Sequence, residues 1–247
     1  MRSILITGCN RGLGLGLVKH LLKRADRPEL LIATCRDMTK AQELQELSNS
    51  NKNVHILQFD VTEFDKHKQF ATEVQKIVGD DGLNVLFNNA GTSPKYTRLP
   101  FVKPEQLMDT FRTNTVAPII LAKTLLPFLK QAAQKNISLP MGVQRAAIVN
   151  MSSILGSIQN NQDGGLYPYR CSKTALNQAT ATMRMDLKED GIMAVALHPG
   201  WVRTDMGGSK APLDVDQSTS AMVDFIYSMG ESHNGGFYQY DGEKIPY

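Results

Sequence analysis

Residues 3–24, SILITGCNRGLGLGLVKHLLKR, combine an apolar run, a glycine-rich turn and an amphipathic run. The SILIT segment is typical of a buried strand, and a helical pattern resumes after Gly12. Gly8 permits a tight turn, while Gly12 and Gly14 allow close backbone approach and close helix packing. Because the free N–H groups at the start of such a helix bind phosphate, this stretch predicts a nucleotide-binding α/β fold.

The rest of the chain repeats this alternation of strand and helix patterns. The strand candidates are SILIT, LLIATC, NVHILQFD, LNVLFNN, AAIVNMSS, IMAVALHPG and GGFYQYDG, and the helix candidates are 12–24, 39–48, 64–78, 104–134, 168–189 and 217–229. Repeated strand–helix–strand units predict a Rossmann-type, doubly wound parallel sheet of about seven strands with helices on both faces. The irregular stretch 134–145, QKNISLPMGVQR, is interpreted as a surface loop, so residues 1–247 are expected to form a single domain.

Composition excludes several classes of protein. The 247 residues, 42% of them hydrophobic, suit one domain, and 27 basic against 24 acidic residues do not indicate a nucleic-acid partner. The first strand begins too early for a signal peptide, and no apolar stretch approaches ~20 residues, so we expect a cytoplasmic protein with no membrane partner.

Cys9, Cys35 and Cys171 are widely spaced and indicate neither a disulfide framework nor a metal site. Cys9 lies in the phosphate turn and Cys171 stands between two candidate catalytic residues, Tyr169 and Lys173. We therefore consider the hypothesis that oxidation of either thiol obstructs the site, which requires the thiol to be exposed and low in pKa.

Tyr169 and Lys173 lie four residues apart in a stretch expected to be helical, so their side chains share one face. An adjacent ammonium favours the phenolate and lowers a tyrosine pKa from its usual value near ~10, which would let the pair pass a proton at neutral pH. Tyr167 is excluded from this role because the residue four positions later is the uncharged Cys171. A solvated surface contact is the alternative interpretation of the pair.

Polar residues come directly after the expected strands, whose carboxyl ends meet at one edge of a parallel sheet. Arg36 and Asp37 come after the second strand. A guanidinium there can bind the 2′-phosphate of NADP, whereas a carboxylate would bind the ribose 2′-OH of NAD. Arg36 and Arg11 together favour NADP, although Asp37 leaves NAD open. Ser153 ends the fifth strand and can either cap the next turn of the chain or reach the same substrate atom as Tyr169.

Six motifs, in order and across nearly the whole chain, resemble those of the short-chain dehydrogenase/reductase family. They are Thr7-Gly8-x-x-x-Gly12-x-Gly14, Asn88-Asn89-Ala90-Gly91, Asn114, Ser153, Tyr169-x-x-x-Lys173 and Pro199-Gly200. The segments TGCNRGLG, NVLFNNAG, NMSSILGSI, HPGWVRTDMGG and GGFYQYDG are similar to those of sniffer-type carbonyl reductases.

This resemblance implies an NADPH-dependent carbonyl reductase acting on aldehydes, ketones or quinones. It implies that Tyr169 is the general acid, that Ser153 binds the carbonyl oxygen and that Lys173 lowers the tyrosine pKa and holds the nicotinamide ribose. It further implies that Asn114 anchors a water linking Lys173 to solvent. The cofactor-binding residues implied for NADP(H) are Gly8, Asn10, Arg11, Gly12, Leu13, Gly14, Arg36, Asp60, Val61, Asn89, Ala90, Gly91, Tyr169, Lys173, Pro199, Gly200, Val202 and Thr204.

Several alternatives stay open. One is an NAD(P)-dependent dehydrogenase oxidising an alcohol, steroid or retinoid, and another is a non-catalytic NADP(H)-sensing protein. The family also includes monomers and homodimers paired through the helices at 104–134 and 168–189. Residues 160–165, NNQDGG, lengthen the usual interval between serine and tyrosine and are expected to border the substrate cleft, while residues 206–218 are expected to form a lid.

Overall fold

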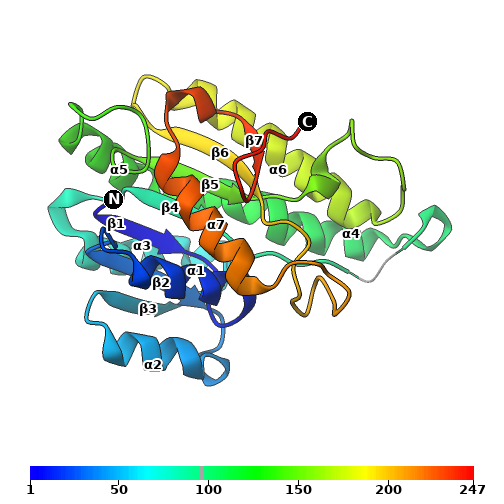
Figure 1. Cartoon of the computed structure of the whole chain (residues 1–247), viewed down its shortest axis with the longest axis horizontal. Helices are drawn as coiled ribbons and strands as arrows, with labels where there is room; N and C mark the ends of the chain where they lie inside the picture. The colour runs from blue at the N-terminus through cyan, green and yellow to red at the C-terminus, as the bar shows by residue number, and fades with distance from the viewer. Residues whose placement is uncertain (95–96) are drawn as a thin grey trace.

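A computed structural model, which describes residues 1–94 and 97–247, contains one sheet of seven parallel strands in the order β3-β2-β1-β4-β5-β6-β7 (Figure 1). The strands are β1 (Ser3–Ile6), β2 (Leu30–Cys35), β3 (Val54–Gln58), β4 (Val85–Asn88), β5 (Ala147–Met151), β6 (Met193–His198) and β7 (Phe237–Gln239). The direction of strand order reverses between β1 and β4, and ligands bind beyond the carboxyl ends of the strands at such a point. The expected Rossmann-type sheet is confirmed.

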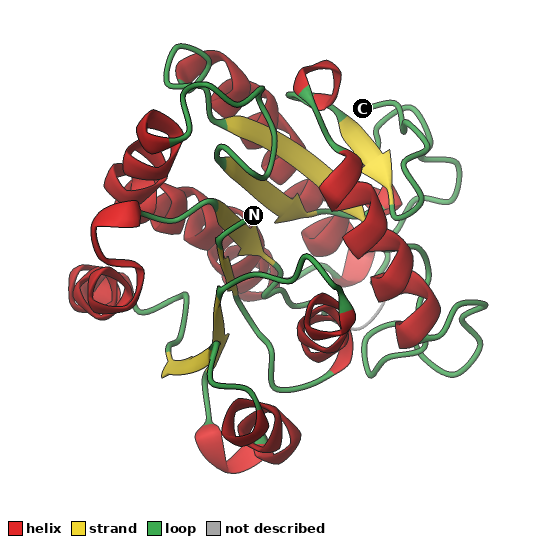
Figure 2. Cartoon of the chain, turned by 60° about the vertical axis from the view of Figure 1, so that its left-hand side comes forward, coloured by secondary structure: helices red, strands yellow, loops and turns green. Residues whose placement is uncertain are grey.

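Strand β1 shows why helices cover both faces. Ile4 and Ile6 belong to one hydrophobic cluster and Leu5 to another, and each of the three side chains is at most 1% exposed. The first cluster includes side chains of α1 (Gly12–Lys23), α2 (Gln42–Ser50) and α7 (Val215–Ser228). The second includes side chains of α3 (His67–Val78) and α5 (Ala117–Lys135), so the sheet lies between two helical layers (Figure 2).

The expected helix at 104–134 contains a local change of winding. It consists of α4 (Pro104–Phe111), a π-helical turn (Arg112–Val116) and α5. Pro118 has no N–H with which to close an α-helical bond to the carbonyl of Asn114, which favours the wider turn. The sequence pattern predicted the helix but not this interruption.

Other boundaries shift by a few residues. The expected helix at 39–48 is a 3₁₀ turn (Met38–Lys40) followed by α2, and that at 64–78 is a 3₁₀ turn (Phe64–Lys66) followed by α3. The expected helix at 168–189 is α6 (Tyr167–Asp186), and no regular element is found between α5 and β5 in the described chain. Further 3₁₀ turns are Gly79–Asp81, Leu99–Phe101, Ile154–Gly156 and Glu231–His233.

One described helical stretch, Pro104–Lys135, has the length and apolar composition needed to cross a bilayer, which the sequence pattern did not predict. Half of its most apolar window is buried inside the fold. Leu121, Leu125 and Leu129 of α5 are 0% exposed and belong to the core between α5 and the sheet. The apolar character of this helix is therefore accounted for by packing.

Candidate active site

The glycine turn after β1 is built for close backbone approach. Gly8 and Gly12 have φ values of 72° and 56°, which L side chains rarely adopt. A Cβ on Gly14 would stand 2.1 Å from the carbonyl oxygen of Gly8, so only glycine lets α1 begin this close to the turn. Among the described residues, no side chain caps the start of α1, and its first turn holds no acidic residue. The N–H groups there are thus available to an anion.

The Asn89-Ala90 segment after β4 braces this turn. The Asn89 side chain donates to the carbonyls of Thr7 and Gly8 at 2.8 and 3.1 Å. In return, the Thr7 hydroxyl accepts from the backbone N–H groups of Asn89 and Ala90 at 3.0 and 2.9 Å. The two predicted cofactor segments therefore form one hydrogen-bonded unit at the switch point of the sheet.

Arg36 is exposed at the carboxyl end of β2, where the sequence predicted it. The neighbouring Asp37 is turned away toward the next 3₁₀ turn, where its Oδ1 accepts from the backbone N and the hydroxyl of Thr39 at 3.0 and 2.6 Å. These bonds from Thr39 lower the pKa of the Asp37 carboxyl. The Asp37 carboxylate, which could have favoured NAD by binding its ribose, therefore caps the 3₁₀ turn instead.

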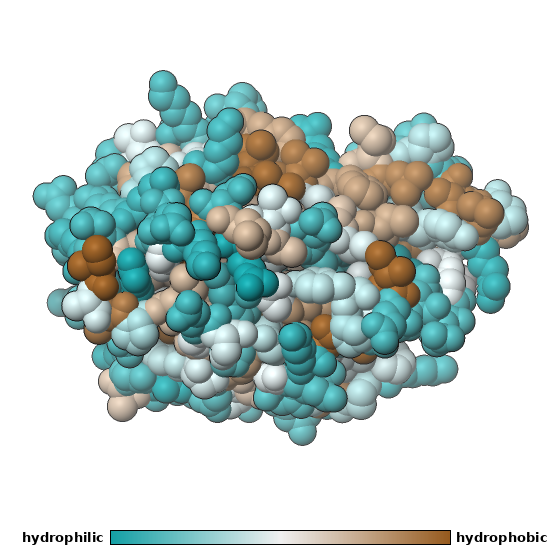
Figure 3. Space-filling view, turned by 90° about the horizontal axis from the view of Figure 1, so that it is seen from above, coloured by the Kyte–Doolittle hydropathy of each residue, from teal (hydrophilic) through white to brown (hydrophobic). Residues whose placement is uncertain are grey.

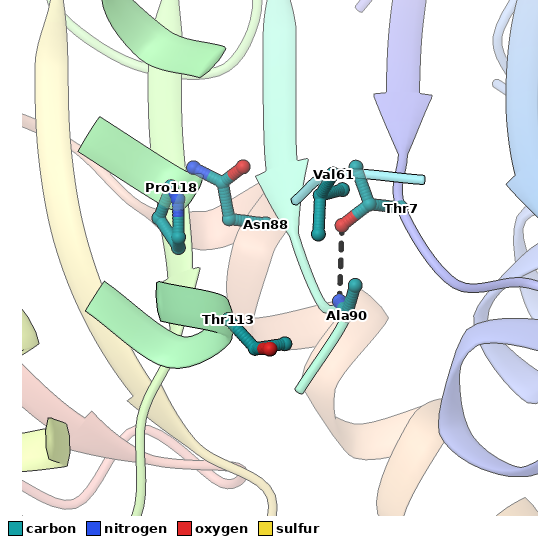
Figure 4. Close-up of a pocket in the computed structure, with 6 residues that line it drawn as sticks. All are labelled: Thr7, Val61, Asn88, Ala90, Thr113 and Pro118. Atoms are coloured by element: carbon teal, nitrogen blue, oxygen red, sulfur yellow. Dashed lines mark hydrogen bonds between the residues drawn. The ribbon is translucent and has the colours of Figure 1, made fainter. Parts of the chain in front are cut away.

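A hollow lies between the ends of β1, β4 and the π turn (Figure 4). It is lined by Thr7, Val61, Asn88, Ala90, Thr113 and Pro118. Beside Val61, the Asp60 carboxylate accepts from the backbone N and hydroxyl of Thr62 at 2.9 and 2.7 Å. These bonds hold the Asp60-Val61 pair in a fixed turn after β3.

Ser153, Tyr169 and Lys173 lie together at the carboxyl end of β5. Ser153 is 6% exposed and caps the 3₁₀ turn Ile154–Gly156, where its hydroxyl accepts from the N–H of Leu155 at 3.2 Å. The same side chain is near enough to Tyr169 to favour the phenolate, which lowers the pKa of that tyrosine. Lys173 is 3% exposed, and its Nζ lies 5.7 Å from the centroid of the Tyr169 ring. A Cβ on Gly91 would stand 3.7 Å from that Nζ, so the Lys173 side chain adjoins the segment that braces the glycine turn.

The electrostatics of the Tyr169-Lys173 pair differ from the sequence-based expectation. The pKa of Tyr169 is raised above its usual value, because burial disfavours the phenolate more than the nearby Ser153 side chain favours it. The Lys173 ammonium instead donates to the carbonyl of Met151 at 2.6 Å, and burial lowers its pKa to about 8. The two residues share a face as predicted, but the side chain that favours the phenolate is Ser153 and not Lys173.

The backbone entering α6 is strained. Leu166 has φ 51°, a left-handed conformation uncommon for a branched side chain, and its N–H donates to Thr97 at 3.0 Å. Gly164 and Gly165, at the end of the NNQDGG segment, also have positive φ. Such strain is concentrated at functional sites and persists only where the surrounding structure enforces it.

Asn114 lies in the π turn and is 0% exposed. Its Oδ1 accepts from the N–H of Thr92 at 2.8 Å, and its Nδ2 donates to the carbonyl of Thr92 and to the hydroxyl of Ser172 at 2.8 and 3.1 Å. Asn114 therefore ties the loop after β4 to α6. Its predicted role in anchoring a water is not tested by these contacts.

The loop after β6 is closed by its own hydrogen bonds. The Trp201 indole donates to Gly207 at 2.8 Å, and the Arg203 guanidinium donates to the carbonyls of Ala211 and Pro212 at 3.0 and 2.8 Å. The sequence motifs did not single out Asp205, which comes after Thr204 and pairs with Arg11. The sequence shows Asp205 in the HPGWVRTDMGG segment, but it does not show that this acid pairs with Arg11, which lies far away in the chain.

Cys9 and Cys171 differ in exposure, so the oxidation hypothesis has a different outcome for each. Cys9 is 0% exposed and its thiol donates to the carbonyl of Ile6 at 3.2 Å, and burial raises its pKa. The hypothesis is therefore wrong for Cys9, because a buried thiol with a raised pKa is inert. Cys171 is exposed on α6, and its role stays a prediction.

Comparison with known proteins gives a consistent result. Residues 2–213 match the family model described as short chain dehydrogenase. The carbonyl reductase Sniffer of D. melanogaster is 56% identical with a TM-score of 0.99 and full coverage of both chains. An NADPH-bound carbonyl reductase from chicken fatty liver is 40% identical, with a TM-score of 0.95 and coverage of 100% and 99%. The protein named C-signal from Myxococcus xanthus is 37% identical over 67% of this chain and 93% of its own length. The chain therefore belongs to the short-chain dehydrogenase family.

Proposed function

We propose that this oxidoreductase is an NADPH-dependent carbonyl reductase that reduces small lipophilic aldehydes, ketones or quinones. The observation that carries the proposal is the meeting of Ser153, Tyr169 and Lys173 beside the braced glycine turn. Support also comes from two solved relatives, the carbonyl reductase Sniffer of D. melanogaster and the NADPH-bound carbonyl reductase from chicken fatty liver.

The glycine turn fits a dinucleotide. The backbone cradle that a Cβ on Gly14 would fill, and the uncapped start of α1, suit a pyrophosphate. We propose that Arg11 and Arg36 bind the 2′-phosphate, because guanidinium groups form paired hydrogen bonds with phosphate. The other residues that we propose to hold the cofactor are Gly8, Asn10, Gly12, Leu13, Gly14, Asp60, Val61, Asn89, Ala90, Gly91, Tyr169, Lys173, Pro199, Gly200, Val202 and Thr204.

When bound, NADPH supplies the hydride. The chain's own residues act on the substrate oxygen, where negative charge develops during reduction. The Tyr169 hydroxyl donates its proton to that oxygen, and the Ser153 hydroxyl donates a hydrogen bond to the same atom. The resulting phenolate is stabilised by Lys173, whose buried Nζ lies on the same helix face.

A lipophilic substrate is supported by exposed apolar side chains in the segment after Ser153 and in the loop after β6. Ile158, Trp201 and Met206 are 71%, 56% and 53% exposed. Figure 3 shows hydrophobic side chains gathered toward the right-hand end of the molecule, where Figure 1 places α4. Exposed apolar patches of this kind mark binding surfaces.

We propose that residues 1–247 act as one domain, since a single sheet runs through all seven strands. A homodimer through α4, α5 and α6 is supported by exposed apolar side chains on these helices and on the π turn between α4 and α5, namely Met108, Val116, Ile119 and Met185. A cytoplasmic location and the absence of nucleic-acid and membrane partners stay predictions from the sequence.

The test is the Tyr169→Phe variant, with Tyr167→Phe as the matched control two residues away. Loss of the phenolic proton should lower kcat by ~10²–10⁴-fold in the first variant and leave the dissociation constant of NADPH nearly unchanged. The control should keep wild-type turnover on the same aldehydes and quinones. Wild-type turnover in Tyr169→Phe would exclude this tyrosine as the acid.

The same panel separates the alternatives. Faster oxidation of alcohols than reduction of carbonyls would favour a dehydrogenase. Tight NADPH binding by the wild-type chain, with no turnover in either direction, would favour a non-catalytic sensor.

A further inference from the structure

The segment that carries Ser153 is attached to α6 by side chains that the mechanism above does not use. Ser152 and Asn177 are each 2% exposed, and the Ser152 hydroxyl donates to Asn177 Oδ1 at 2.5 Å. Asn177 Nδ2 donates to the carbonyl of Gly156 at 3.3 Å. One amide therefore holds both ends of the segment 152–156.

Asn177 continues the row formed by the catalytic pair. Tyr169, Lys173 and Asn177 are spaced by four residues on α6, so they lie one above another on one helix face. Lys173 donates to the carbonyl of Met151 at 2.6 Å, immediately before Ser152. Bonds from this row thus flank Ser153 on both sides along the chain.

Packing leaves the segment little room to move. A Cβ on Gly156 would stand 2.9 Å from the Cβ and carbonyl carbon of Lys173, so the turn lies directly against the helix backbone. Thr174 adds a hydrogen bond from its hydroxyl to the carbonyl of Gly156 at 2.9 Å. The distance between the Ser153 turn and α6 is therefore set by buried contacts.

We propose that Asn177, together with Ser152, is a positioning residue that holds Ser153 within hydrogen-bond reach of Tyr169. This inference rests on the proposed function. A hydrogen bond weakens over a few tenths of an ångström, and a misplacement of ~1 Å in a catalytic site can cost ~10²-fold in rate. The Ser152–Asn177 bond supplies this constraint without contact with the substrate.

The fold offers a matched control between the same two elements. Asn150 of β5 donates to the Thr180 hydroxyl of α6 at 2.9 Å, and both residues are 0% exposed. Thr180→Val removes the shorter of the two bonds from the Asn150 amide, which also donates to the Met183 sulfur at 4.0 Å, and is expected to destabilise the fold by ~1–3 kcal/mol. Because Thr180 lies beyond Asn177 from the catalytic pair, its loss should not move Ser153.

The experiment compares Ser152→Ala, Asn177→Ala and their double variant with Thr180→Val. We expect a fall in kcat of ~10–100-fold in the first three, a dissociation constant for NADPH within ~3-fold of wild type, and a double variant no slower than the slower single variant. Amide hydrogen exchange in residues 153–157 should accelerate in the same three variants. Thr180→Val should keep kcat within ~2-fold at a similar loss of stability.

The proposal is overturned if Ser152→Ala matches Thr180→Val in kcat, since the contact would then serve stability alone. If Asn177→Ala does not fold, Ser152→Ala alone tests the proposal, because it removes only the hydroxyl oxygen that bonds Asn177. If the wild-type chain binds NADPH but reduces no carbonyl, the proposed function fails by itself. Hydrogen exchange then still tests whether the Ser152–Asn177 hydrogen bond holds the segment 152–156. Unchanged amide exchange at residues 153–157 in Ser152→Ala would overturn the proposal.

Discussion

Arg11 and Asp205 form an ion pair, with the arginine Nη1 2.6 Å from the aspartate Oδ2. Arg11 precedes α1 in the glycine turn, and Asp205 comes after Thr204 in the loop between β6 and α7. The pair links the two loops between which we propose that the cofactor binds. Both side chains are largely exposed, at 71% and 75%, and ion pairs of this kind contribute about 0–1 kcal/mol.

Asp205→Asn is predicted to strengthen NADPH binding, because Arg11 would no longer divide its interactions between a carboxylate and the 2′-phosphate. The gain should be at most ~5-fold and should shrink at high salt. Calorimetric titration with NADPH and NADH at two salt concentrations measures it. An equal gain for NADH would indicate that the substitution opens the loop instead of freeing the arginine.

Arg36→Asp is predicted to erode the preference for NADPH. A charged hydrogen bond to the 2′-phosphate contributes ~1.5–3 kcal/mol, so the ratio of kcat/KM values for NADPH and NADH should fall by about ten- to a hundredfold. Asp37 should not itself bind the ribose 2′-OH of NADH, since its carboxylate accepts from the N–H of Thr39 and caps that turn. If the ratio does not change, Arg11 carries the discrimination.

Lys173 is predicted to make stability depend on pH. Burial lowers its pKa to about 8, while the unfolded chain keeps a value near ~10.4. Between these two values the unfolded state binds more protons than the folded state, so the free energy of unfolding rises with pH. Below about pH 8 the buried lysine is charged, and its destabilising effect is then at its maximum.

Lys173→Met lacks this ionisation and isolates the effect. Its free energy of unfolding minus that of the wild type should fall by on the order of 3 kcal/mol between about pH 7 and 10.5. Urea unfolding at half-unit intervals of pH measures the difference. Two curves that stay parallel over the range would contradict a lowered pKa.

Gly14→Ala is predicted to destabilise the chain, although alanine in a helix usually stabilises it by ~1 kcal/mol relative to glycine. The new Cβ would stand 2.1 Å from the Gly8 carbonyl oxygen and 2.7 Å from Asn89 Nδ2. Overpacking of this kind costs ~1–3 kcal/mol or more and should also displace the cofactor turn. Thermal unfolding and NADPH titration test it, and a variant of raised stability would refute the contact.

Gly79→Ala provides a comparison for backbone strain alone. Gly79 has φ 59°, and an added Cβ would meet no described atom within 4 Å. Its substitution should cost ~1 kcal/mol without affecting NADPH binding. A loss of cofactor binding in this variant would mean that general destabilisation, rather than the local clash, explains Gly14→Ala.

Local patterns were sufficient for much of the fold. The apolar runs predicted the seven strands, since buried strands of a parallel sheet are hydrophobic on both faces, as Ile4, Leu5 and Ile6 show. Helix ends were less accurate because they depend on individual caps such as that of Asp37. The π turn at Arg112–Val116 was not predicted, because it differs from an α-helical turn in its backbone hydrogen bonds and not in a pattern of apolar residues.

The sequence by itself determined that a glycine turn would join the first strand to a helix, and that Tyr169 and Lys173 would share a helix face. Both result from the conformational freedom of glycine and from helical spacing, which are properties of neighbouring residues. Only the tertiary structure decided which groups meet across the chain: that Lys173 donates to Met151, that Asn177 holds Ser152, and that Arg11 pairs with Asp205. Burial and long-range contact set these pairings and the resulting pKa shifts, and neither is encoded in the spacing of nearby residues.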